Sequence, residues 1–93
     1  MITIYTKDWC GYCTRAKNYF IENDIEYEEI NIDEDSSALD FMKAEGHKTV
    51  PQIYYNDKLF LSGGYSTLKT LEKWEIHERI KNIKGVDPNE FKF

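Results

Sequence analysis

The chain has 93 residues, of which 41% are hydrophobic, and a formal net charge of −5. A chain of this length forms one domain around a single core, which we expect at residues 1–84, with a C-terminal tail at 85–93. The acidic charge argues against a nucleic-acid partner, because that binding depends on neutralising phosphates. No segment resembles a signal peptide or a membrane span, so we expect a cytoplasmic monomer without membrane contacts.

Hydrophobic periodicity divides the chain into alternating strands and helices. Apolar runs predict four strands, at residues 2–6, 27–32, 52–55 and 58–61. Helical spacing predicts three helices, at residues 11–22, 36–45 and 66–82. Ser37 and Asp40 fit a capping box for the second helix, which Gly46 ends. The order β-α-β-α-β-β-α predicts an α/β fold with a four-stranded mixed sheet and helices on both faces.

The two cysteines form a Cys10-Gly11-Tyr12-Cys13 motif where the first strand feeds the first helix. In a reducing compartment such a pair is more often catalytic or metal-binding than structural. The helix N-terminus and Lys7 both favour a thiolate at Cys10, which we predict to be the nucleophile. Cys13 lies one turn further on and is predicted to resolve a mixed disulfide or to close a disulfide with Cys10.

Charged residues are unevenly placed around this motif. Lys7, Arg15 and Lys17 flank the cysteines, whereas residues 18–42 contain acidic residues and no lysine or arginine. Two interpretations stay open, an ordinary solvated acidic face and a basic rim that attracts an anionic substrate to the thiols. A zinc site is not favoured, because His47 and His77 are isolated and no second ligand pair accompanies the cysteines.

Three motifs at matching spacing resemble the glutaredoxins, small thiol oxidoreductases of the thioredoxin fold. The segment Lys7-Asp8-Trp9-Cys10-Gly11-Tyr12-Cys13 is similar to the family's Lys-x-x-Cys-Pro-Tyr-Cys. Thr49-Val50-Pro51 is similar to its Thr-Val-Pro loop, and Gly63-Gly64-Tyr65-Ser66 to the segment that enters its last helix. The resemblance covers residues 2 to about 82. It implies a glutathione-dependent thiol–disulfide oxidoreductase with a redox-active Cys10–Cys13 pair.

The resemblance also implies a glutathione site beside Cys10. Pro51 is expected to be cis and to place the Val50 backbone beside Cys10, although a proline that merely begins a strand is also permitted. Lys7 and Lys48 are expected to meet the glycyl carboxylate. Backbone N–H groups at a helix N-terminus are expected to hold the γ-glutamyl carboxylate. The implied glutathione-binding residues are Lys7, Tyr12, Lys48, Thr49, Val50, Pro51, Gly64, Tyr65 and Ser66. Trp9 is a candidate shield for the thiols.

Two departures from the family pattern leave alternatives open. Gly11 stands where the commonest motif has proline, and glycine variants of the family can hold a [2Fe–2S] cluster between two subunits, with Cys10 of each and glutathione as ligands. Leu61-Ser62-Gly63-Gly64-Tyr65 partly matches the segment of glutaredoxin-like redoxins that thioredoxin reductase reduces. The longer segment before Gly63 predicts an extended or bulged last strand. Expected partners are glutathionylated or disulfide-containing proteins, with ribonucleotide reductase as one candidate.

Overall fold

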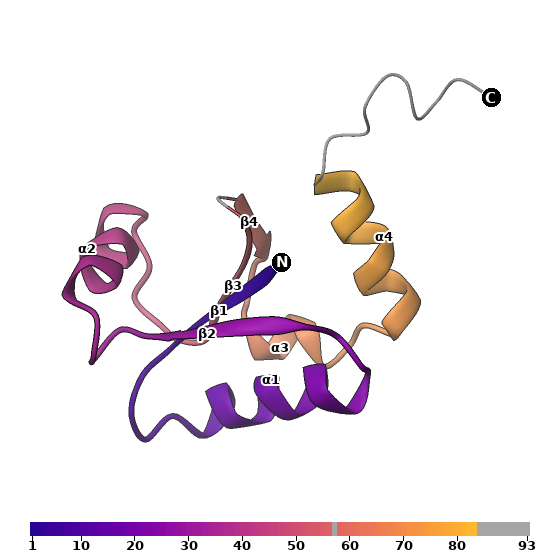
Figure 1. The fold of residues 1–93 in the computed structure, drawn as a ribbon, viewed down its shortest axis with the longest axis horizontal. Coiled ribbons are helices and arrows are strands. Elements are labelled where there is room, and N and C mark those ends of the chain that lie inside the picture. The colour runs from indigo at the N-terminus through magenta and orange to yellow at the C-terminus, as the bar shows by residue number, and fades with distance from the viewer. Residues whose placement is uncertain (57, 84–93) are drawn as a thin grey trace.

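The computed structural model describes residues 1–56 and 58–83, and the predicted tail at 85–93 lies outside the described residues. Figure 1 shows how the elements are arranged. They are β1 (Ile2–Thr6), α1 (Gly11–Glu22), β2 (Tyr27–Asn31), α2 (Ser36–Ala44), β3 (Gln52–Tyr55), β4 (Lys58–Leu61), α3 (Tyr65–Leu68) and α4 (Lys73–Ile83). None of the described helices has the length and apolar character needed to cross a membrane.

The four strands form one mixed sheet in the order β2-β1-β3-β4. β1 pairs parallel with β2, whereas the β1–β3 and β3–β4 pairs are antiparallel. Ile53 pairs with Leu61 but Tyr54 pairs with Leu59, so Phe60 is an extra residue in β4. This β-bulge confirms the predicted irregularity of the last strand, and the sheet confirms the predicted fold class.

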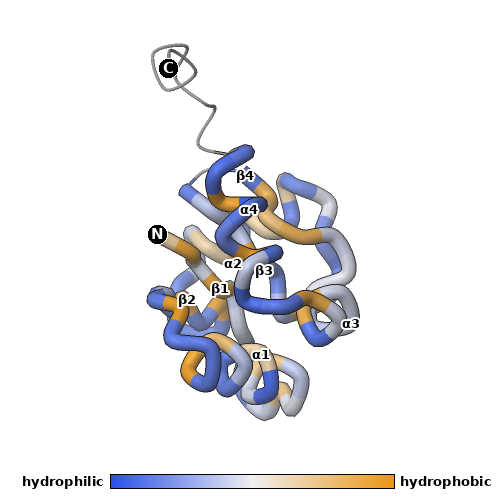
Figure 2. The backbone as a smooth tube through the Cα atoms, turned by 90° about the vertical axis from the view of Figure 1, so that its right-hand side faces the viewer, coloured by the Kyte–Doolittle hydropathy of each residue, from blue (hydrophilic) through white to orange (hydrophobic). Residues whose placement is uncertain are grey.

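Side-chain alternation along the strands builds a core on each face of the sheet. On one face Ile2, Ile4 and Ile53 pack with Phe20 of α1 and Leu68 of α3, and all five are at most 1% exposed. The other face is smaller and largely aromatic. It packs α2 on the sheet around the buried Tyr54, whose ring contacts those of Tyr5 and Phe41 at centroid distances of 5.5 and 5.4 Å. Figure 2 shows the hydrophobic stretches of β1 and β4 in orange.

The second helix begins at Ser36, as predicted, but its N-cap is not the predicted one. Asp35, not Ser37, is the N-cap, because the Asp35 carboxylate accepts hydrogen bonds from the N–H groups of Ser37 and Ala38, each at 3.1 Å. The Ser37 hydroxyl also donates to this carboxylate and is the main reason that the pKa of Asp35 is lowered. Gly46, at φ +79°, ends the helix as predicted.

The predicted single helix at 66–82 is wrong, because the chain forms α3 and α4 with a break between them. Both Leu68 and Leu71 are buried in the core. The Leu71 carbonyl accepts a hydrogen bond from the Tyr19 hydroxyl, which lies 52 residues earlier, in place of a helical partner. The Glu75 carboxylate then accepts the Glu72 N–H at 3.2 Å and starts α4. A tertiary contact therefore outweighs the helical propensity of this segment.

Candidate active site

Cys10 is the N-cap residue of α1 and the last residue of the loop that follows β1. Its backbone is extended, with φ −102° and ψ 105°, and its Sγ accepts the Cys13 N–H at 3.1 Å. This N–H and the positive end of α1 both stabilise negative charge on the sulfur. Cys10 is partly exposed and is a free thiol, so it is accessible to attack a substrate.

Cys13 occupies the buried side of the same helical turn and is 2% exposed. Burial, followed by its contact with the Cys10 sulfur, raises the pKa of the Cys13 thiol to about 12. Lys17, one turn further along α1, acts in the opposite direction. Cys13 is therefore protonated at neutral pH, and Cys10 is the more exposed of the two sulfurs. The different exposures of the two sulfurs agree with their predicted roles.

The loop before β3 brings its backbone against Cys10. The Val50–Pro51 peptide bond is cis, as the family resemblance implied, and the Cys10 thiol donates to the Val50 carbonyl at 3.9 Å. The Gln52 side-chain amide closes the loop by donating to the Thr49 carbonyl at 2.9 Å. The prediction that Val50 lies beside Cys10 is thus confirmed, and Gln52 is a loop-holding residue that the sequence reasoning missed.

A groove of about 280 Å³ runs beside this loop. It is lined by Tyr12, Thr49, Val50, Pro51, Gln52, Gly63, Gly64, Tyr65 and Ser66. All the predicted glutathione-binding residues except Lys7 and Lys48 are therefore gathered along one groove. The rings of Tyr12 and Tyr65, two of these lining residues, have their centroids 6.2 Å apart.

The end of this groove at α3 is tightly constrained. Gly64 has φ +54°, and a Cβ at this position would lie 2.6 Å from the Pro51 carbonyl oxygen. Only glycine allows this close approach of two backbones. α3 has four residues, and the Ser66 N–H already donates to the Gly63 carbonyl at 3.2 Å. The predicted anion site used the N–H groups of Gly64, Tyr65 and Ser66. Of these three, only Gly64 and Tyr65 have N–H groups free of hydrogen bonds to described residues, so the site has two donors and not three.

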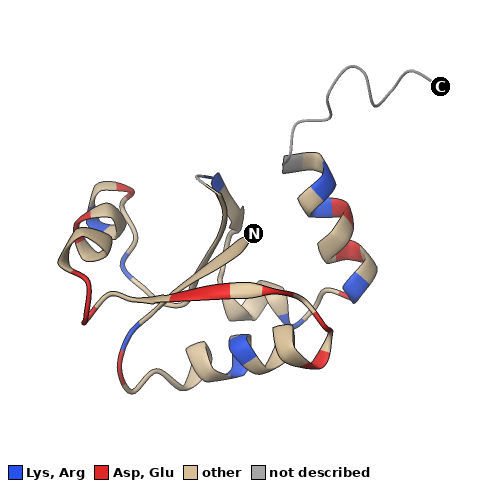
Figure 3. Ribbon diagram, in the orientation of Figure 1, with Lys and Arg blue, Asp and Glu red and all other residues tan. Residues whose placement is uncertain are grey.

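Lys7 and Lys48 lie on the opposite side of the Thr49-Val50 segment. Both line a separate cleft of about 230 Å³, together with Lys43 and His47. Figure 3 shows basic residues, in blue, on α2, on the loop after it and on the loop after β1. The sequence predicted one continuous glutathione site, and the structure divides its residues between two hollows that share Thr49 and Val50. Lys7 also lines the cavity that contains Cys10 and Cys13.

Comparison with known proteins shows which family the chain belongs to. Residues 2–60 match the family model described as Glutaredoxin. A glutaredoxin of Mycobacterium tuberculosis is 34% identical over 86 residues, which is 90% of this chain and 94% of that protein. The chain belongs to the glutaredoxin family.

Solved structures agree with this family and with a thioredoxin-like fold. The glutaredoxin-like protein NrdH-redoxin from Escherichia coli superposes with a TM-score of 0.64 at 25% identity, covering 76% of this chain and 93% of that one. The buckwheat glutaredoxin–glutathione complex superposes with a TM-score of 0.67 at 21% identity, covering 92% and 81%. As a glutaredoxin with a free Cys10–Cys13 pair, the protein is a thiol–disulfide oxidoreductase.

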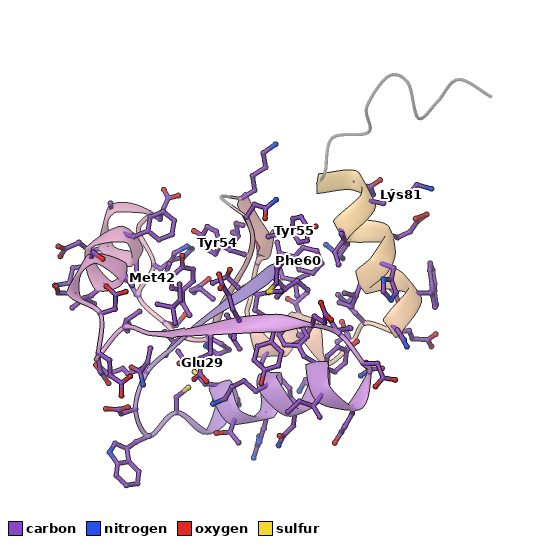
Figure 4. The ribbon with its side chains drawn as sticks, in the orientation of Figure 1. Glu29, Met42, Tyr54, Tyr55, Phe60 and Lys81 are labelled. Atoms are coloured by element: carbon purple, nitrogen blue, oxygen red, sulfur yellow. The ribbon has the colours of Figure 1, made fainter. Side chains whose placement is uncertain are left out.

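A charged pair behind the cysteines of this glutaredoxin escaped the sequence analysis. Lys17 Nζ lies 3.1 Å from a carboxylate oxygen of Glu29, which also accepts the Thr6 hydroxyl at 2.7 Å. The Thr6 hydroxyl first, and Lys17 next, lower the pKa of Glu29. Figure 4 shows Glu29 between β2 and α1, and the pair lines one cavity with Cys10 and Cys13. The four-residue spacing from Cys13 to Lys17 was the available signal, because it puts both on one helix face.

Two further expectations about this glutaredoxin have different outcomes. Trp9 does not shield the thiols, because its side chain is fully exposed and its backbone has φ +60°. The possible [2Fe–2S] cluster stays a prediction. Within residues 1–56 and 58–83 no group of three or more His, Cys, Asp or Glu could hold a metal ion.

Proposed function

We propose that this glutaredoxin uses glutathione to reduce glutathionylated proteins and other mixed disulfides in the cytoplasm, acting as a monomer. The observation that carries this proposal is the groove beside Cys10. It combines the backbone of Val50 and Pro51, the Tyr12 ring and the N–H groups of Gly64 and Tyr65, and the Val50 carbonyl brings it within 3.9 Å of the Cys10 sulfur. An extended tripeptide with an acidic group at each end fits such a groove, because backbone pairing orients it and N–H groups receive a carboxylate.

The reaction begins with the Cys10 thiolate. It attacks the glutathione sulfur of a mixed disulfide, a Cys10–glutathione disulfide forms, and the substrate sulfur leaves as a thiolate that takes up a proton. A second glutathione thiolate attacks the glutathione sulfur bound to Cys10. Oxidised glutathione leaves and the Cys10 thiolate returns. One free glutathione thiol is consumed for each substrate thiol released, because the other half of the oxidised glutathione is the glutathionyl group taken from the substrate.

Cys13 gives the second route. After losing its proton, its sulfur attacks Cys10 within the mixed disulfide, so that the Cys10–Cys13 disulfide forms and the bound thiol leaves reduced. This route requires the buried Cys13 thiol, whose pKa is raised, to lose its proton first. We therefore propose that Cys13 serves protein disulfides and is dispensable for glutathione mixed disulfides.

The lysines are assigned to the glycyl end of glutathione. Lys7 and Lys48 are both exposed, and neither forms an ion pair with a described residue. They stand beyond Val50 from the groove, so a carboxylate reaching past that residue would meet them. The opposite end of the tripeptide would then lie at Gly64 and Tyr65.

The test is turnover of a small glutathione mixed disulfide, with glutathione reductase regenerating glutathione. We expect wild type and Cys13→Ser to turn over at similar rates and Cys10→Ser to remain at the rate without protein. An inactive wild type would contradict glutathione dependence. Equal losses in both variants would contradict the separate roles of the two sulfurs.

A second candidate is a redoxin that thioredoxin reductase reduces. It is favoured by the likeness to NrdH-redoxin, whose structural description reports a thioredoxin-like activity profile. Replacing glutathione and its reductase with thioredoxin reductase and NADPH in an insulin-reduction assay tests it. Activity there, with none toward glutathione, would establish this alternative and would make ribonucleotide reductase the first protein substrate to examine.

A further inference from the structure

The cleft lined by Lys7, Lys43, His47 and Lys48, here called the basic cleft, has a composition unlike that of the groove. Its floor is apolar and consists of Ile32, Leu39, Met42 and Val50. Ile32 and Met42 are at most 9% exposed, so this floor is part of the packed face under α2. Figure 4 shows Met42 on the side of α2 that faces the sheet. The cleft thus offers an apolar surface beneath a cationic rim.

The lysines of this rim are not paired with carboxylates among the described residues. Lys7, Lys43 and Lys48 form no ion pair there, although the chain as a whole carries a net charge of −5. Three ammonium groups around one small hollow repel one another, and a bound anion relieves this repulsion. The charge pattern therefore selects an acidic occupant.

His47, the fourth residue of the cleft's rim, is held in place by a residue of the core. His47 Nε2 lies 2.6 Å from the Tyr54 hydroxyl, and the two rings meet edge to face with centroids 5.7 Å apart. Tyr54 is 2% exposed and belongs to the cluster beneath α2. One wall of the basic cleft is consequently preformed, which lowers the entropic cost of binding a ligand there.

The position of the cleft relative to Cys10 identifies what reaches it. Val50 lines both the groove and the basic cleft, and its carbonyl is 3.9 Å from Cys10 Sγ. A polypeptide whose cysteine is joined to Cys10 runs along this loop, so residues next to that cysteine lie over Val50. Glutathione ends within a residue of its own cysteine, whereas a protein continues past Val50 and can place side chains in the cleft.

We propose that the basic cleft selects protein disulfide substrates in which an acidic residue and an apolar residue flank the reactive cysteine. The acidic side chain meets Lys43 and Lys48, and the apolar side chain covers Leu39 and Met42. This proposal rests on the proposed function, since it names the substrate class of the same reactive sulfur. It makes Lys43 and His47 specificity-determining residues that have no contact with the groove.

The experiment compares two peptides, each with one cysteine and each oxidised to its symmetrical disulfide, so that attack by Cys10 always joins a peptide to Cys10, attack by Cys13 then closes the Cys10–Cys13 disulfide, and two peptide thiols leave. One peptide carries Glu and Leu beside the cysteine, and the other carries Lys and Leu. Single-turnover oxidation of the reduced protein by each peptide is followed by tryptophan fluorescence and by mass. We expect wild type to react with the acidic peptide about fivefold faster at low salt, a preference of the size that exposed charge pairs give. Raising the salt concentration should reduce it.

Lys43→Glu is the test variant and Lys81→Glu the matched control. Both lysines stand in the last turn of a helix, so both substitutions change the net charge and the helix-end electrostatics alike. Figure 4 shows Lys81 on α4, on the other side of the molecule from α2. We expect Lys43→Glu to abolish or reverse the ratio between the peptides and Lys81→Glu to retain it.

The outcomes separate this proposal from the proposed function. A wild-type ratio near one, or an equal fall in both variants, would overturn the proposal. The single-turnover assay needs no glutathione reduction step, so a wild type that fails with free glutathione but prefers the acidic peptide would contradict only the proposed function. Lys48→Gln, which keeps the side-chain volume, should lower the ratio in the same direction as Lys43→Glu.

Discussion

The two walls of the groove differ in how much sequence variation their geometry allows. The α1 wall continues from Tyr12 into the neighbouring cavity lined by Cys10, Gly11 and Cys13, and a Cβ added to Gly11 would meet nothing within 4 Å. On the α3 wall, a Cβ added to Gly64 would lie 2.6 Å from the Pro51 carbonyl oxygen, at φ +54°. The α1 wall, called the open wall below, therefore leaves space beside Cys10, whereas the α3 wall, called the tight wall below, is fixed by two backbones in contact.

The largest effect is expected from a substitution that removes the reactive sulfur of the open wall. Cys10→Ser replaces a good nucleophile with a hydroxyl that stays protonated, so disulfide exchange should fall to the rate without protein. The change is nearly isosteric, and the Ser Oγ can still cap α1, so the fold should be retained. Turnover and circular dichroism measured on one preparation check both parts. Activity above background would show that Cys13 can act as the attacking sulfur.

The second largest effect is expected from a substitution at Gly64, in the tight wall. Gly64→Ala combines an unfavourable φ with a close contact, and we expect it to lower the free energy of unfolding by about 3 kcal/mol and to weaken glutathione turnover. Gly46→Ala is the matched control, because Gly46 also has positive φ but nothing within 4 Å of an added Cβ. Urea unfolding should show a loss of only about 1 kcal/mol in the control. Similar losses in the two variants would mean that the Pro51 contact does not fix this wall.

Alkaline pH should lower the stability that Cys13, the buried cysteine of the open wall, contributes to the native state. Cys13 keeps its proton in the native state up to a pKa of about 12, whereas an ordinary thiol releases it near 9.0. The stability contributed by the buried neutral thiol is therefore complete below pH 9 and declines as pH rises toward 12. Comparison with Cys13→Ala cancels the other titrating groups. The stability difference between the two reduced proteins should shrink by about 1 kcal/mol between pH 8 and pH 10.

This pH dependence can be contradicted simply. A stability difference that stays constant from pH 8 to pH 10 would show that the Cys13 thiol titrates normally. Alkylation gives an independent check, because iodoacetamide at pH 8 should modify Cys10 and leave Cys13 unmodified in the folded protein. Mass spectrometry of peptides after digestion distinguishes the two sites.

The smallest effect tests the freedom of the open wall. Gly11 is the first residue of α1, where proline is favoured, and the extended backbone of Cys10 tolerates a following proline. Gly11→Pro should therefore preserve turnover and raise the free energy of unfolding by roughly 0.5 kcal/mol. Thermal unfolding and the glutathione assay measure the two quantities. A marked loss of either would mean that the α1 wall needs the flexibility of glycine.

Local hydrogen bonding explains why much of the site could be predicted from sequence. The motif from Cys10 to Cys13 fixes a strand-to-helix junction, and the N-cap bond from the Cys13 N–H to Cys10 Sγ spans three residues. Gly46 ends α2 for a similarly local reason, its positive φ. Pro51 is a different case. Its cis bond was expected only from the family motif, because the residues alone also allowed a proline that begins a strand.

The remaining features depend on partners that are distant in the chain. The break between α3 and α4 follows from Tyr19, whose hydroxyl donates a hydrogen bond to the Leu71 carbonyl. No local pattern places those two residues together. Likewise, Lys7 and Lys48 fall outside the groove because α2 packs on the sheet and gives them a cleft of their own. The sequence by itself determined the strand–helix order and the reactive sulfur, because periodicity and capping act over a few residues. Only the tertiary structure decided which side chains share a hollow, because burial acts between elements that pack together regardless of their separation in the chain.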